Sequence, residues 1–198
     1  MPQPSLILAS LSPFRKTILE NAGLDFTVAG AEIDERQVEQ NFAQISPEEL
    51  AKNLARAKAE NVSCQFPQAL VIGCDQTLDF DGQVLHKSAS LDEAYNRLHA
   101  LSGKTHYLHS GIALAKAGTT IWFDLSSAKM TMRPLSSQFI NYYLDRVGKD
   151  VLASVGAYQI EGEGIQLFEK IDGDYFTIIG LPLLLLLKKL RQMGVIKQ

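Results

Sequence analysis

Two hydrophobic patterns alternate along this chain, and they predict strands that alternate with helices. A short apolar run with β-branched residues, typical of a buried strand, occurs at 70–72, and the segment 5–9 (SLILA) is predicted to form a first strand. Polar segments with apolar residues at helical spacing lie between them, and the clearest runs through Leu50, Leu54 and Val62. The alternation predicts an α/β protein with a mixed twisted sheet and flanking helices.

Serine caps mark the expected helix starts. Ser12-Pro13 and Ser46-Pro47 each combine an N-cap serine with a proline at the first helical position, so helices are predicted to begin there. Ser90 and the segment 135–137 open two further helices, and a last helix is predicted over Pro182–Met193.

A hairpin is predicted after the apolar run 70–72. Gly73 is expected to end that strand, which places Asp75 at its carboxyl end, where ligands bind in open α/β sheets. Asp81-Gly82 is a typical hairpin turn between 76–80 and 83–86, and Lys87 follows the hairpin. A carboxylate and a lysine so placed suit a metal and a polyphosphate. The alternative is that both are solvated surface groups.

The remaining segments complete the alternation. The polar sequence after Glu35 is expected to be a loop. Further strands are predicted over Phe26–Ala29, Thr105–Leu114, Thr120–Met132, Ile165–Glu169 and Tyr175–Ile179. No linker or internal repeat interrupts them, so the whole chain, 1–198, is predicted to form one domain with two lobes.

Composition excludes several classes of function. The net charge of −3 and pI of about 5.8 argue against a nucleic-acid partner. The apolar stretch Ile178–Leu187 contains Gly180 and Pro182 and falls short of the ~20 residues that span a bilayer, so no membrane role is expected. Only Cys64 and Cys74 are present, and no secretory signal is apparent, so a reducing cytoplasm is the expected location.

Two attractive patterns fail. The segment 102–105, Ser-Gly-Lys-Thr, imitates the end of a P-loop but leads from a helix into a strand, the reverse of the required order. His106 and His109 are three residues apart on a predicted strand and would point to opposite faces, so they cannot chelate one metal. Packing or surface roles are expected for all four histidines.

A helix N-terminus at 12–16 offers an anion site. Unpaired backbone N–H groups and a partial positive charge attract phosphate there, and Arg15 and Lys16 in the first turn oppose the helix dipole unless an anion joins them. The alternative is that both side chains point to solvent. Dispersed carboxylates and cations together suit metal-assisted attack on a polyphosphate, and they are Arg15, Lys16, Glu35, Lys58, Asp75 and Lys87.

Seven blocks distributed over nearly the whole chain resemble, in order, those of the Maf family of nucleotide pyrophosphatases. They are 10–16 (SLSPFRK), 34–35 (DE), 54–59 (LARAKA), 73–76 (GCDQ), 101–103 (LSG), 156–158 (GAY) and 180–183 (GLPL). The resemblance implies a Maf/ITPase-like fold with two lobes around a central cleft, often a homodimer. It also implies cleavage of a nucleoside triphosphate to the monophosphate and pyrophosphate, dependent on Mg²⁺ or Mn²⁺.

The resemblance also implies roles for individual residues. Asp75 would accept a proton from the attacking water and, with Glu35, would hold the metal. The triphosphate would be bound by Arg15, Lys58 and Lys87, with Ser10 and Lys16 as further phosphate contacts.

Three positions differ between branches of the family, and the resemblance uses them to predict the substrate. Phe14, Gln76 and Glu161 are similar to the branch that acts on 7-methyl-GTP, whereas dTTP and UTP pyrophosphatases carry Arg, Thr and Gln. N7-methylation gives guanine a positive charge that favours an aromatic face, and a carboxylate can accept from its N1–H and N2–H₂ groups. The lysine of the hairpin is followed by Ser88, where the family usually has proline.

A housecleaning 7-methyl-GTP pyrophosphatase is therefore the main hypothesis. A dTTP/UTP pyrophosphatase and a non-catalytic nucleotide-binding regulator of cell division or septum formation are the alternatives.

Overall fold

The computed structural model describes residues 5–41 and 45–197. The chain divides into two compact units. Of the described residues, unit 1 contains 5–41, 45–76, 109–126 and 175–197, and unit 2 contains 77–108 and 127–174. Strands β3 (Leu70–Phe80), β5 (Thr105–Lys116) and β6 (Thr119–Met132) each contribute residues to both units.

The sheet is mixed, as the sequence predicts. Among the described residues it has seven strands in the order β2-β1-β3-β5-β6-β7, with β4 paired to β3. β1 (Leu6–Leu8) runs parallel to both β2 (Phe26–Val28) and β3. β4 (Gln83–Leu85) and β7 (Phe168–Asp172) run antiparallel to β3 and β6 respectively. The predicted α/β fold with a mixed sheet and flanking helices is confirmed.

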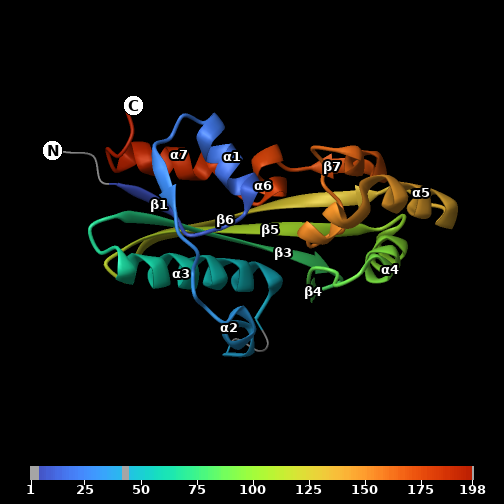
Figure 1. Cartoon of the computed structure of the whole chain (residues 1–198), viewed down its shortest axis with the longest axis horizontal. Helices are drawn as coiled ribbons and strands as arrows, with labels where there is room; N and C mark the ends of the chain where they lie inside the picture. The colour runs from blue at the N-terminus through green and yellow to red at the C-terminus, as the bar shows by residue number, and fades with distance from the viewer. Residues whose placement is uncertain (1–4, 42–44, 198) are drawn as a thin grey trace. The chain divides into compact units, whose positions relative to one another are not determined.

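Helices cover both faces of the sheet in unit 1. Figure 1 shows α1 (Pro13–Asn21), α6 (Tyr175–Ile179) and α7 (Leu183–Gln192) on one side of β1 and β3, with α3 (Pro47–Gln65) on the other. Leu8, Ile72 and Leu186 belong to the core on the first side, and Ile7 and Val71 to the core on the second. Alternate residues of one strand therefore serve two apolar layers.

Glycine allows α3 to lie directly on the sheet. A Cβ atom on Gly73 would come within 2.1 Å of the Ala55 carbonyl oxygen, and one on Gly111 within 2.3 Å of the Ala51 carbonyl oxygen. Real side chains cannot approach so closely, so any larger residue at 73 or 111 would push the helix away. This contact fixes the height of α3 above β3 and hence the position of the side chains beside Gly73.

Unit 2 contains α4 (Leu91–Leu101), α5 (Ser137–Val147) and two short 3₁₀ helices, η1 (Gly148–Ala153) and η2 (Glu163–Leu167). Its core includes the fully buried His106, whose Nε2 lies 2.6 Å from the hydroxyl of Tyr158. The Tyr158 ring meets Phe168 edge-on, with centroids 4.8 Å apart. The packing role predicted for His106 is confirmed.

The serine caps and the hairpin are also confirmed. Ser12, Ser46, Ser90 and Ser136 are the N-caps of α1, α3, α4 and α5, and each side chain accepts a backbone N–H three residues ahead. The Asp81-Gly82 turn joins β3 to β4, and both residues have positive φ angles, +54° and +79°. No helix among the described residues is long and apolar enough to cross a membrane.

Two predictions about β3 are wrong. Gly73 does not end the strand, which continues to Phe80, so Asp75 lies within β3 and not at its tip. The strand continues because β5 and β4 supply further partners after β1 ends opposite Ile72. Asp75 nevertheless lies beyond the carboxyl end of the parallel pairing, the edge at which ligands bind in such sheets.

Three predictions elsewhere need correction. The expected loop after Glu35 begins as helix α2 (Glu35–Asn41), whose Gln37 N–H donates to Asp34 Oδ1 at 3.1 Å, and residues 42–44 lie outside the described residues. The segment 175–179 is helix α6 and not a strand, because a short apolar run fits either structure. β7 begins at Phe168, after η2, so the strand predicted over 165–169 is displaced by three residues.

Candidate active site

An ammonium group between two carboxylates is the centre of the charged cluster in unit 1. Lys58 Nζ lies 2.5 Å from Asp75 Oδ1 and 2.7 Å from Glu35 Oε1. Asp75 is buried, whereas the Glu35 side chain is 56% exposed. One carboxylate is thus part of the protein interior and the other remains open to solvent.

The packing of α3 explains how these groups meet. Gly73 and Asp75 are two residues apart and therefore share one face of β3. The close approach of α3 at Gly73 brings the helical turn 55–59 over that face. Lys58 lies on this turn, and its side chain is 12% exposed. Sequence spacing alone does not reveal the contact, because 17 residues separate Lys58 from Asp75.

Burial and charge act in opposite directions on this cluster. Burial raises the pKa of Asp75 above its ordinary value, although the Lys58 and Arg15 cations oppose the rise. For Lys58, burial alone would lower the pKa, but Asp75 and Glu35 outweigh it and the pKa is raised. Asp75 is therefore a better proton acceptor than an exposed aspartate, while Lys58 keeps its charge.

Arg15 forms a second cationic point in unit 1. Its Nε donates to the Gly180 carbonyl at 2.8 Å, and its Nη1 donates to the Cys74 carbonyl at 2.9 Å and to Ser10 Oγ at 3.2 Å. These bonds fix the guanidinium beside the residue that precedes Asp75. Gly180 has φ of +99°, a backbone conformation that favours glycine.

The N-terminus of helix α1 lies next to Arg15. Ser12 caps the helix by accepting the Arg15 N–H at 3.5 Å, and the buried Ser10 accepts the Ser12 N–H at 3.3 Å. Lys16 instead pairs with Glu20 at 3.4 Å, and both side chains are about half exposed. The structure thus joins Ser10 to Arg15 and directs Lys16 to the surface ion pair. Phe14, on the same helix, is half-buried.

Gln76 projects from the opposite face of β3 to Asp75. Its Nε2 lies 3.0 Å from Ser110 Oγ and from the carbonyl oxygens of Thr177 and Ile178. The amide therefore links β3 to β5 and α6. The sequence identified Gln76 only through the family resemblance, since its partners lie 34 and about 100 residues away.

Lys87 and Glu161 belong to unit 2, where both are exposed. Lys87 lies between β4 and α4, and Glu161 lies in the glycine-rich segment that leads to η2. Among the described residues, no ion pair involves either side chain.

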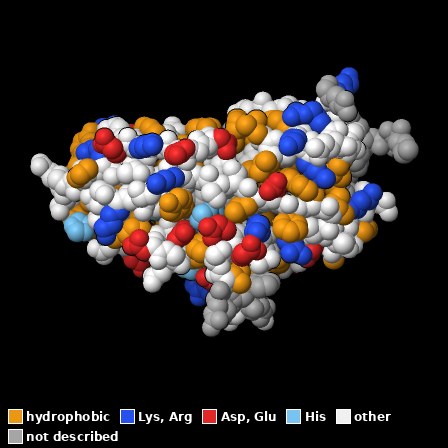
Figure 2. Space-filling model, turned by 180° about the vertical axis from the view of Figure 1, so that it is seen from behind, with side chains coloured by type: hydrophobic (Ala, Val, Ile, Leu, Met, Phe, Trp, Pro, Cys, Tyr) orange, Lys and Arg blue, Asp and Glu red, His pale blue; other side chains and the backbone are white. Residues whose placement is uncertain are grey.

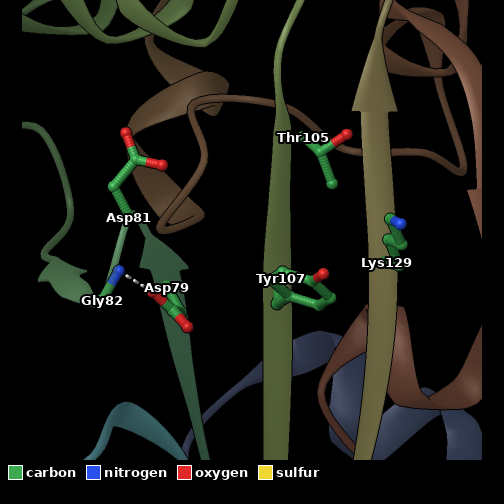
Figure 3. A pocket seen from close by; sticks show the side chains of 6 residues that line it. All are labelled: Asp79, Asp81, Gly82, Thr105, Tyr107 and Lys129. Carbon is green, nitrogen blue, oxygen red and sulfur yellow. Dashed lines mark hydrogen bonds between the residues drawn. The ribbon is translucent and has the colours of Figure 1, made fainter.

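A hollow of about 290 Å³ in unit 2 was not anticipated from the sequence. Figure 3 shows Asp79, Tyr107 and Lys129 on the neighbouring strands β3, β5 and β6, and their side chains form one wall of it. Thr105 Oγ1 and Thr131 Oγ1 are 3.0 Å apart, so these two residues lie opposite each other on β5 and β6. Two residues further along each strand, Tyr107 therefore lies opposite Lys129. Three strands contribute to the hollow, so no local sequence pattern could indicate it.

Charges on the surface are mixed. On the face shown in Figure 2, Lys and Arg side chains are interspersed with Asp and Glu, and no continuous basic stripe crosses it.

Two carboxylates of unit 1 offer oxygen ligands of the kind that a divalent metal takes. Glu35 and Asp75 each direct one carboxylate oxygen at the Lys58 ammonium, and Glu35 remains open to solvent. Hard cations take such oxygen ligands and usually keep several waters.

Comparison with known proteins places the chain in a well-populated group. A family model described as "Maf-like protein" matches residues 5–193. A 7-methyl-GTP pyrophosphatase of Bartonella quintana is 61% identical over 192 residues, which is 97% of either chain. One of Rhizobium johnstonii is 56% identical over 98% of either chain, and one of Brucella abortus 54% over 94% of this chain and 95% of its own.

Among solved structures, a HAM1 protein from Coxiella burnetii aligns with 65% of this chain and 73% of its own. The identity is 15% and the TM-score 0.42, values that support no functional conclusion.

Proposed function

The chain belongs to the Maf family, and from that premise we propose that it hydrolyses 7-methyl-GTP to 7-methyl-GMP and pyrophosphate. Relatives that are 53–61% identical over nearly the whole chain carry the name 7-methyl-GTP pyrophosphatase. The observation that carries the proposal is the cluster of Asp75, Lys58 and Glu35, a buried proton acceptor held by a cation beside a solvent-accessible carboxylate.

Asp75 acts as the general base. Water attacks the α-phosphorus in line and gives its proton to the free carboxylate oxygen of Asp75. A bond forms between the water oxygen and the α-phosphorus, and the bond to the α–β bridging oxygen breaks, releasing pyrophosphate. The raised pKa of Asp75, caused mainly by burial, favours this transfer. Lys58 fixes the orientation of the carboxylate through Oδ1.

Cations bind the triphosphate. Arg15 is anchored by two carbonyls and by Ser10, so its remaining N–H groups are held ready for a phosphate oxygen at the N-terminus of α1. Lys58 and Lys87 supply further positive charge, and Lys16 contributes at longer range once it leaves Glu20. Each cation offsets charge that develops on the phosphate oxygens in the transition state.

Glu35 and Asp75 would hold a divalent cation, Mg²⁺ or Mn²⁺. When bound, it would neutralise charge on the phosphate oxygens. Lys58 keeps the two carboxylates close together, because its ammonium contacts both.

Phe14 and Glu161 are proposed to read the base. The cationic 7-methylguanine ring stacks on an aromatic face, and a carboxylate accepts from its N1–H and N2–H₂ groups. Gln76 is proposed to contact the substrate as well, and the carbonyls of Thr177 and Ile178 fix the position of its amide. Thymine and uracil lack the paired donors that Glu161 would accept.

The deciding experiment measures pyrophosphate release from 7-methyl-GTP, GTP, dTTP and UTP. We expect 7-methyl-GTP to have the highest kcat/KM. Asp75→Asn should abolish release while nucleotide binding persists, whereas Asp145→Asn, at an exposed site, should match the wild type. Faster turnover of dTTP and UTP would assign the chain to that substrate class instead.

Binding without any pyrophosphate release would favour the regulator of cell division. For the enzyme, we propose a cytoplasmic housecleaning role, in keeping with Cys64 and Cys74, which are both free thiols.

A further inference from the structure

The loop that carries Lys87 is bound at both sides by one face of α4. Arg97 Nη1 donates to the carbonyl of His86 at 2.8 Å, and the N–H of Ala89 donates to Glu93 Oε2 at 2.8 Å. Arg97 and Glu93 are four residues apart and therefore neighbours on the helix. The backbone on either side of Lys87 is thus tied to α4, while the Lys87 side chain remains exposed.

The same nitrogen of Arg97 holds a second segment of unit 2. Nη1 also donates to the carbonyl of Val155 at 2.6 Å, directly before the glycine-rich segment that contains Glu161. Two features define the backbone at the start of this segment. A Cβ on Gly156 would lie 2.2 Å from the Tyr158 ring, and Ala157 has a φ of +58°. One guanidinium therefore connects two chain segments that are about 70 residues apart.

We propose that Arg97 is a positioning residue for this reaction: it holds Lys87 for the triphosphate and the segment of Glu161 for the base. The inference rests on the proposed function, because it needs both residues to contact substrate. Lysine is a poor substitute for this arginine, because its flexible ammonium lacks the planar, pre-organised geometry of the guanidinium that holds both carbonyls. Substrate binding then requires less ordering of these segments.

Arg97→Met tests the inference against a matched control. Arg133 also donates from its guanidinium to a backbone carbonyl of unit 2, that of Gln166 at 2.7 Å, but it contacts neither segment. We expect Arg97→Met to lower kcat/KM for 7-methyl-GTP about 10–100-fold and to reduce the preference over GTP. Arg97→Lys should recover little of the loss, and Arg133→Met should stay within about twofold of the wild type.

A double-mutant cycle separates positioning from general damage. If Arg97 acts through Lys87, Arg97→Met should cost much less in a Lys87→Met background than in the wild type. Equal losses in both backgrounds, or an Arg97→Met enzyme as active as Arg133→Met, would overturn the inference. If Arg97→Met does not fold, Arg97→Lys is judged by the same cycle. Wild-type enzyme that releases no pyrophosphate would refute the proposed function itself, a separate outcome.

Discussion

The buried histidine of unit 2 should make the protein sensitive to mild acid. His106 is fully buried, and its burial lowers the pKa to about 4 from the ordinary 6.5. In the unfolded chain the imidazole takes a proton near pH 6.5, whereas in the folded state it stays neutral until about pH 4. The free energy of unfolding is therefore at its full value above pH 6.5, and it falls as the pH is lowered from 6.5 to about 4.

The magnitude follows from the size of the shift. A difference of about 2.5 pKa units corresponds to about 3.4 kcal/mol once the pH is below both values. A pH of 5 lies more than halfway from the unfolded-state pKa to the folded-state pKa, so the free energy of unfolding should be about 2 kcal/mol lower at pH 5 than at pH 7. This is a substantial fraction of the total stability of a typical domain.

Urea unfolding at pH 7, 6 and 5 measures this loss. Glutamine at position 106 keeps an amide near the Tyr158 hydroxyl but cannot titrate, so His106→Gln should lose about 2 kcal/mol less than the wild type between pH 7 and 5. His99→Gln, at an exposed position, controls for the loss of an imidazole. Parallel stability curves for the wild type and His106→Gln would show that the reasoning from burial is wrong.

Three further predictions concern unit 1. Lys58→Met should lower kcat/KM at least about 100-fold and shift the acid limb of the pH–rate profile to higher pH. The reason is that Asp75 loses the cation that opposes its protonation, while the nearby Glu35 carboxylate still raises its pKa. An acid limb at the wild-type pH would contradict this. Gly73→Ala should cost about 1–3 kcal/mol or more in urea unfolding, since its Cβ would meet α3 at 2.1 Å, whereas Gly162→Ala, with its nearest atom at 3.9 Å, should be tolerated; equal stabilities would refute the close-packing argument. Chelation with EDTA should abolish pyrophosphate release and added Mg²⁺ or Mn²⁺ should restore it; full activity in EDTA would exclude a metal at Glu35 and Asp75.

The candidate site depends on how closely a helix lies on a strand. The cation of Lys58 reaches Asp75 because Gly73 leaves room for the backbone of α3. A stability defect at Gly73 is therefore expected to appear as an activity defect as well. Gly73 thus affects the chemistry of the site only through packing: it lets α3 lie close enough to β3 for Lys58 to reach Asp75.

Local signals in the sequence determined much of the secondary structure. The four serine caps each depend on a bond between residues three apart, so α1, α3, α4 and α5 could be predicted from short segments. The Asp-Gly turn fixed the hairpin of β3 and β4 for the same reason, because its φ angles suit these residues. The order of the blocks also indicated the family.

Tertiary structure decided the rest. Whether 175–179 became a helix, and whether β3 continued past Gly73, depended on partners that other parts of the chain supply. The contacts of Lys58 with Asp75 and of Arg15 with Gly180 join residues 17 and 165 positions apart. A side chain's local sequence fixes its conformational preferences, but which charges meet, and how deeply they are buried, is set only when the distant segments pack together.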